Sequence, residues 1–106
     1  MYRQGDVLLV PVSGELLPAG ARPVARDARH RLVLALGEVT GHAHAVAARD
    51  AELFAAPDDA DRRFLRIGST SLLTHEEHRA IPLPPGLYRV LRQREYSPVG
   101  VRRVAD

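Results

Sequence analysis

Short apolar runs separated by glycine- and proline-rich turns set the pattern of this chain. The clearest run covers residues 6–12, where Val and Leu dominate between two turn-forming pairs, 5–6 and 13–14. A continuous, β-branched run of this length, bounded by turn residues, is typical of a buried strand. Similar runs predict further strands at 30–36, 38–47, 51–55, 63–67, 71–75 and 87–96.

The spacing of these runs predicts the fold class. No stretch of useful length shows apolar residues at helical spacing, and residues 14–23 and 81–86 hold the prolines and glycines of loops and turns. Many short strands joined by such turns are typical of an all-β sandwich or barrel of antiparallel strands. We therefore expect a single β domain over residues 1–106. For the alanine-rich segment 45–60, one turn of helix is the alternative.

The composition excludes several classes of chemistry but says little more about the fold. The chain has 106 residues and no cysteine, which excludes disulfides, thiolate zinc sites, iron–sulfur clusters and thiol catalysis. No apolar run is long enough to cross a bilayer, and the first residues lack the basic-then-apolar order of a secretory signal. We expect a cytoplasmic protein that does not enter membranes.

All the basic residues other than histidine are arginine, yet the net charge is only +2. Two groups of arginines could meet the phosphates of a nucleic acid. Few aromatic side chains accompany them, so platforms for base stacking are scarce. We favour a solvated basic surface and keep nucleic acid as an alternative partner. The first group is Arg22, Arg26, Arg29 and Arg31, and the second is Arg89, Arg92, Arg94, Arg102 and Arg103.

Four of the five histidines lie in two pairs, and these pairs carry the strongest chemical signal. His42 and His44 are two positions apart on a predicted strand, so their side chains share one face, and Ala43 between them points the other way. Two imidazoles on one face form half of a metal chelate. Gly41, directly before the pair, indicates a bulge or a close backbone approach.

The second pair, His75 and His78, would complete such a site. On a regular strand the two rings would point to opposite faces, but a bulge or turn at Glu76 and Glu77 would let them converge. The glutamates could then act as ligand, as orienter of an imidazole or as general base. The candidate metals are zinc, iron, nickel, copper and manganese. The predicted metal ligands are His42, His44, His75 and His78, and the predicted catalytic residues are Glu76, Glu77 and His78.

Two alternatives stay open for these histidines. The pairs could lie on opposite sides of the domain and act as polar turn residues. They could also do acid–base work without a metal, with His75 and His78 beside a glutamate such as Glu38, Glu76 or Glu77.

Three other polar segments have a structural interpretation beside a functional one. In segment 93–96, Gln93 and Tyr96 could line a pocket and Arg94 could hold a carboxylate or phosphate, but we favour an edge strand with a solvated face. Residues 3–6 are predicted to be the turn before the first strand. The aspartates of segment 57–61 lack the ligand spacing of a calcium loop, so we expect a solvated turn.

Four segments together resemble an uncharacterised family of small bacterial and phage proteins: RQGDVLLVPV, GEVTGHAH, HEEH and QREY. That resemblance covers nearly the whole chain and implies no established activity. The pair His42 and His44, led by Gly41, is also similar to the metal-binding strand of cupins, where a later histidine completes the site. His75 or His78 would take that place. The glutamate that follows the pair in cupins has no counterpart at the same distance.

Three classes of function are consistent with these observations. The first is a metal-dependent enzyme, hydrolase or oxygenase-like, with an open coordination position at the metal. The alternative is a non-catalytic binding or scaffold module of a larger assembly such as a nucleoprotein, in which the histidines are structural or hold a structural metal. A third possibility is an accessory protein that docks a partner through an exposed strand edge. The expected partner is a small molecule or a protein.

Overall fold

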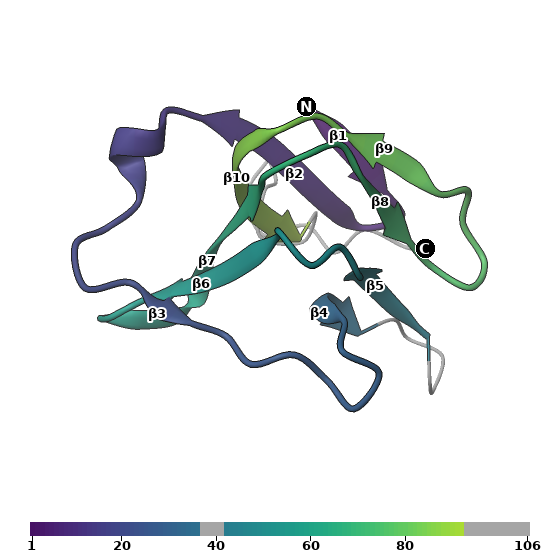
Figure 1. The fold of residues 1–106 in the computed structure, drawn as a ribbon, viewed down its shortest axis with the longest axis horizontal. Helices are drawn as coiled ribbons and strands as arrows, with labels where there is room; N and C mark the ends of the chain where they lie inside the picture. The colour runs from purple at the N-terminus through teal and green to yellow at the C-terminus, as the bar shows by residue number, and fades with distance from the viewer. Residues whose placement is uncertain (37–41, 93–106) are drawn as a thin grey trace, which may run out of the picture.

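The described part of the chain, residues 1–36 and 42–92 of a computed structural model, folds into ten short strands in two sheets (Figure 1). Every strand pairing between these described residues is antiparallel. The one helical element in these residues is a 3-10 turn, η1 (Gly14–Leu16). The all-β prediction is therefore confirmed. Over the same residues, no helix has the length and apolar character that a membrane span needs.

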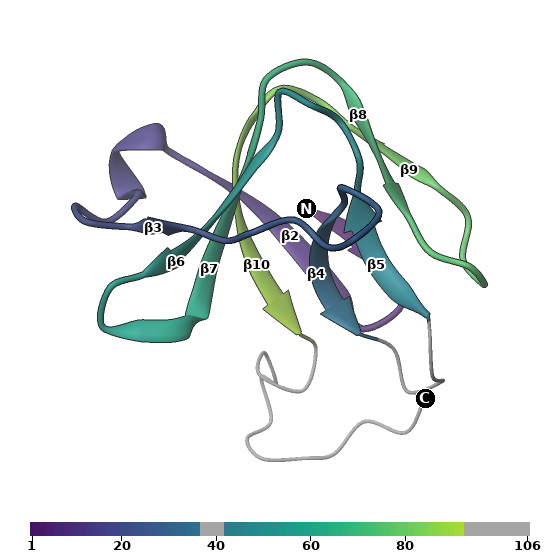
Figure 2. The same cartoon turned by 60° about the horizontal axis from the view of Figure 1, so that its bottom comes forward.

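The larger sheet has six strands and the smaller has four. The larger sheet has the order β1 (Tyr2–Gln4), β2 (Val7–Val12), β10 (Gly86–Arg92), β7 (Asp59–Ile67), β6 (Glu52–Ala56) and β3 (Arg22–Pro23). The smaller sheet has the order β4 (Leu32–Leu36), β5 (Ala43–Val46), β8 (Ser71–Thr74) and β9 (Ile81–Leu83). The β6–β7 and β8–β9 hairpins extend to opposite sides of the molecule (Figure 2).

One cluster of mostly aliphatic side chains joins the two sheets. Leu9, Leu65 and Val90 of the larger sheet are buried in the same cluster as Leu34 and Leu73 of the smaller sheet. Leu65, Leu73 and Val90 alternate along their strands with residues outside this cluster, as the period of two requires. Leu34 is an exception, because the next residue, Ala35, belongs to the same cluster. Burying one such side chain contributes roughly 1.5–3 kcal/mol, so this cluster holds the sheets in the positions that bring the histidines together.

An irregularity in β4 lies beside the first histidine pair. The pairing of β4 with β5 shifts by one residue at Leu34, next to the partner of His44. Such a bulge bends a strand and frees backbone groups, and here the guanidinium of Arg63 in β7 donates to the Leu34 carbonyl oxygen. The bulge predicted at Gly41 and the strand end predicted at 93–96 both lie outside the described residues.

Three segments differ from the sequence predictions. Residues 2–4 form a strand, β1, that pairs with β2 as a hairpin. The proline-rich segment 81–86, predicted as a turn, contains β9, which tolerates Pro82 because β9 is an edge strand of its sheet. The predicted acidic turn is shorter than expected, since β7 already begins at Asp59. The helical alternative for segment 45–60 is not observed, since its described residues belong to strands and turns.

Candidate functional site

The tight turn between β1 and β2 forms the floor of the candidate site. Gly5 and Asp6 are its two turn residues, and Gly5 has a φ of 59°, which glycine adopts without strain. A Cβ atom at Gly5 would lie 2.9 Å from His78 Nε2 and 3.2 Å from His44 Cε1. Two imidazole rings therefore pack directly against the backbone of this turn, and glycine leaves the room for them.

Four imidazole rings lie next to one another beside this turn. His44 is in β5, His42 directly precedes β5, and His75 and His78 lie between β8 and β9. The ring centroids are 4.3 Å apart for His44 and His75 and 4.6 Å apart for His75 and His78. They are 5.6 Å apart for His42 and His75 and 5.9 Å apart for His44 and His78. The chain bends at 76–78, and this bend brings the rings of the second pair together.

His44 is the buried member of the group, and Gln4 fixes its orientation. The Nε2 atom of Gln4 donates to the carbonyl oxygens of Leu73, at 3.0 Å, and Arg79, at 2.9 Å. Both amide protons are then used, so Gln4 Oε1 is the acceptor that lies 2.9 Å from His44 Nδ1. The neutral His44 ring therefore carries its proton on Nδ1 and has a lone pair on Nε2. An imidazole oriented through its other nitrogen in this way is typical of metal-ligating histidines.

The lone pair of His44 faces a carboxylate. His44 Nε2 lies 3.6 Å from Asp6 Oδ1, while Asp6 Oδ2 accepts a hydrogen bond of 2.7 Å from Arg92. Partial burial opposes the charge of Asp6, but Arg92 and His44 together hold the pKa of this carboxyl below its usual value. The pKa of His44 is lowered to about 4, mainly because the ring is buried and secondly because of the neighbouring charge of His75. At neutral pH an uncharged imidazole thus lies beside an ionised carboxylate.

The outer side of the site is more exposed. The backbone N–H of Glu77 donates to His75 Nδ1 at 3.0 Å, and the Glu77 carboxylate lies 3.4 Å from His42 Nδ1. This nitrogen of His42 is buried and has no hydrogen-bond partner within the described residues. Burial, followed by the neighbouring charge of His78, lowers the pKa of His75, although Glu76 and Glu77 act in the opposite direction.

Glu76 connects the bend to the first histidine pair. Its carboxylate accepts a hydrogen bond of 2.9 Å from the backbone N–H of Ala43. This bond is the main reason that the pKa of Glu76 lies below its usual value. A small cavity of about 210 Å³ lies beside this connection. The cavity is lined by Arg31, Ala43, Thr74, His75 and Glu76.

The observed side-chain positions do not form a metal site. Over residues 1–36 and 42–92, no three His, Asp or Glu side chains are arranged to hold a metal ion. Two of the interactions above explain why. The Nδ1 lone pair of His75 is used by a backbone N–H, and Arg92 holds one carboxylate oxygen of Asp6, Oδ2, so that only Oδ1 faces His44. The rings of the predicted ligands are neighbours, but their nitrogen atoms do not converge on one point.

Three residues of this site were missed by the sequence analysis. Segment 3–6 was interpreted as a plain turn, yet Gln4 orients His44, Gly5 accommodates two rings and Asp6 faces a ring nitrogen. The available signal was a glutamine directly before a Gly-Asp turn, at a position that becomes buried in the hairpin.

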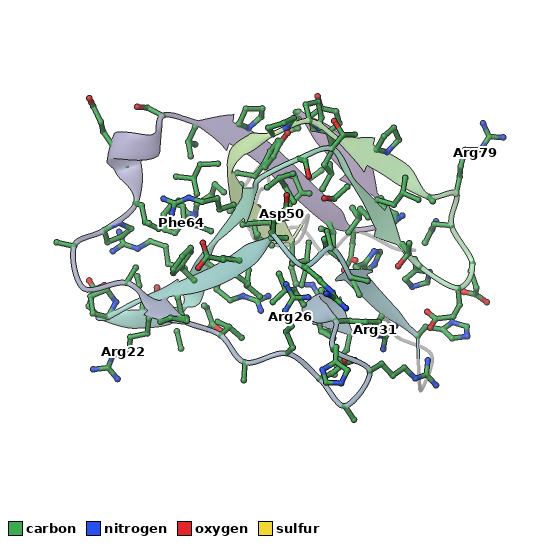
Figure 3. The ribbon with its side chains drawn as sticks, in the orientation of Figure 1. Arg22, Arg26, Arg31, Asp50, Phe64 and Arg79 are labelled. Atoms are coloured by element: carbon green, nitrogen blue, oxygen red, sulfur yellow. The ribbon has the colours of Figure 1, made fainter. Side chains whose placement is uncertain are left out.

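Several arginines of the two predicted groups make contacts within the protein. Arg26 donates to the carbonyl oxygens of Ala48 and Ala51, at 2.7 and 2.8 Å, and Arg31 donates to Asp27. Arg92 is held by Asp6, as described above. By contrast, Arg22 and Arg79 point away from the molecule (Figure 3). Arg94, Arg102 and Arg103 lie outside the described residues.

A family model described as a domain of unknown function, DUF8820, matches residues 3–93. The chain belongs to this family. The resemblance to an uncharacterised family is therefore confirmed, and no cupin family matches. No curated protein and no solved structure matches the chain. The DUF8820 match includes Gln4, Asp6, the four histidines and Arg92, so the whole candidate site lies within the family domain.

Proposed function

We propose that this DUF8820 protein binds a divalent transition metal through His44, Asp6 and His78. The observation that carries the proposal is the hydrogen bond between His44 Nδ1 and Gln4, which leaves a lone pair on Nε2 at 3.6 Å from the Asp6 carboxylate. Both facing atoms are electron-pair donors with no proton of their own to share. A divalent cation between them would stabilise both.

His78 is the ligand that has to move. Its side chain is exposed, it lies in a bend, and its Nε2 atom is next to Gly5, which also contacts His44. A rotation of this ring toward Asp6 would add a second imidazole to the pair. Two histidines and one carboxylate leave open coordination positions and suit iron, and also zinc.

The other predicted residues take supporting roles in this proposal. Glu76 positions the bend through Ala43, so its carboxylate is already occupied as an acceptor. Glu77, which is exposed, and His42, which is partly buried, form the pair that would exchange protons with a bound molecule. A metal with open positions would supply Lewis acidity for hydrolysis or a site for oxygen chemistry. The cavity beside His75 would admit only a small substrate.

Metal titration of the protein without a histidine tag tests the proposal. We expect Co²⁺ and Zn²⁺ to bind at one site, and His44→Gln to lower the affinity by about a hundredfold. His30→Asn is the control, because His30 is the one histidine outside the two pairs and Asn tolerates its φ of 62°. Equal losses in the two variants, or no binding by the wild type, would contradict the proposal.

A scaffold module with a structural metal is the alternative function, and the Co²⁺ form separates the two. A site with open positions takes up azide and changes its visible absorption, whereas a site closed by four protein ligands does not. We expect the spectrum to change on addition of azide. An unchanged spectrum would favour the structural role.

A further inference from the structure

The outer face of the six-stranded sheet carries a groove that is lined by apolar side chains and two arginines. Along β10, Tyr88 and Val90 belong to the core cluster, so Arg89 and Leu91 project from the opposite face. The groove has a volume of about 430 Å³, which lies within the range of small-molecule sites. It is lined by Met1, Val10, Val12, Leu16, Arg62, Phe64, Arg89 and Leu91. Phe64, which is labelled in Figure 3, is the buried aromatic residue among those that line the groove.

Two guanidinium groups in this groove have donors without acceptors. The Nε atoms of Arg89 and Arg62 are buried and lack a hydrogen-bond partner among residues 1–36 and 42–92. The Arg89 guanidinium lies 5.8 Å from the ring centroid of Phe64, and no described acidic side chain forms a salt bridge with it. Arg62 does have a partner at its tip, where Nη2 lies 3.0 Å from Asp58. Buried donors without acceptors are rare in native proteins and need an explanation.

We propose that this groove binds a small organic acid, a carboxylate carried on an apolar chain. The aliphatic side chains of β2, β10 and η1 would cover the hydrocarbon part of the ligand. This contact removes apolar surface from water and buries no further polar group. The carboxylate would accept from the guanidinium groups of Arg89 and Arg62 in the two-point geometry that these groups favour, after a side-chain rotation that turns the buried Nε donors toward the groove. None of the groove residues belongs to the histidine site, so this proposal stands apart from metal binding.

Calorimetric titration with sodium decanoate, beside 1-decanol as the uncharged analogue, tests the groove. We expect decanoate to bind at one site and at least about tenfold more tightly than decanol, because a charge-assisted pair adds to the same apolar contact. Arg89→Met should remove this difference by lowering the decanoate affinity about tenfold while decanol changes little. Methionine keeps an unbranched apolar side chain against Phe64, which protects the fold.

Arg66→Met is the matched control. Arg66 lies on the same face of β7, with its guanidinium 5.5 Å from the ring of Phe54, but it does not line the groove. This variant should bind decanoate as the wild type does. Leu16→Glu, at an exposed rim position, should weaken decanoate binding through charge repulsion. Absence of decanoate binding, equal binding of decanol, or equal losses in Arg66→Met and Arg89→Met would each overturn the proposal.

Discussion

The two sides of the histidine site are built in opposite ways. On the inner side, Gln4 and His44 are almost fully buried, and the amide of Gln4 is held at both ends by hydrogen bonds. On the outer side, His78 and Glu77 are exposed on a bend between two strands. The inner side therefore sets the protonation and direction of one imidazole before any ligand arrives, and the outer side can adjust to a ligand. Stability and binding should consequently respond to different residues.

Gln4→Leu should have the largest effect on stability. The substitution leaves the carbonyl oxygen of Leu73 and Nδ1 of His44 without their partner in a buried position, and the carbonyl oxygen of Arg79 without it in a partly buried one. Unsatisfied buried groups cost about 1–3 kcal/mol each, so we expect the free energy of unfolding to fall by about 3 kcal/mol. Urea denaturation measures this. The control is Thr74→Val, which removes one hydrogen bond at an exposed position of β8 and should cost less than about 1 kcal/mol.

The stability of the metal-free protein should depend on pH through His44. Its pKa is 6.5 in the unfolded chain and about 4 in the folded protein, so between these values only the unfolded chain takes up the proton. Stability is therefore complete above about pH 6.5 and falls by about 2–3 kcal/mol as the pH drops to about 4. Denaturation at a series of pH values in the presence of a chelator gives this profile. His44→Gln should flatten it, and a profile that is unchanged in this variant would assign the proton uptake to other groups.

Gly5→Ala tests the contact between the two sides. The added methyl group would lie 2.9 Å from His78 and 3.2 Å from His44, and the φ of 59° disfavours any residue with a Cβ atom. We expect a loss of about 2 kcal/mol, of which the backbone conformation accounts for about 1–2 kcal/mol. Gly14→Ala, where a Cβ atom would meet nothing within 4 Å, should change stability by less than about 0.5 kcal/mol. A loss at Gly5 no larger than the share of the backbone conformation, about 1 kcal/mol, would show that the rings do not pack tightly against the turn.

The sequence predicted the strands and the neighbouring histidines of this site better than it predicted the hydrogen bonds that orient them. The all-β class, most strands and the importance of His42, His44, His75 and His78 as neighbours could be inferred because apolar runs and residue spacing are local signals. The role of Gln4 could not be inferred from the sequence. It depends on hydrogen bonds to His44, Leu73 and Arg79, which lie 40 to 75 positions away from Gln4 in the sequence.

The edge strand β9 is a second feature that could not be predicted from the sequence, because it depends on the order of strands in the sheet. A proline argues against a central strand, and only the strand order reveals that Pro82 lies at the edge of the smaller sheet, where its missing N–H is tolerated. The groove on the outer face was invisible for a related reason. A strand over residues 87–96 was predicted, but which neighbouring strands place Phe64 and Val10 beside Arg89 depends on the register of the sheet.

His78→Ala should have the smallest effect on stability and still reduce binding. The side chain is exposed, and exposed substitutions of this kind usually change stability by less than about 0.5 kcal/mol. If His78 is the ligand that moves onto the metal, the affinity for Co²⁺ should nevertheless fall by about tenfold or more. Urea denaturation of the metal-free protein and a Co²⁺ titration, carried out on the same preparation, measure the two effects. A loss of stability as large as that of Gln4→Leu would mean that the two sides form one rigid unit, and an unchanged Co²⁺ affinity would remove His78 from the metal site.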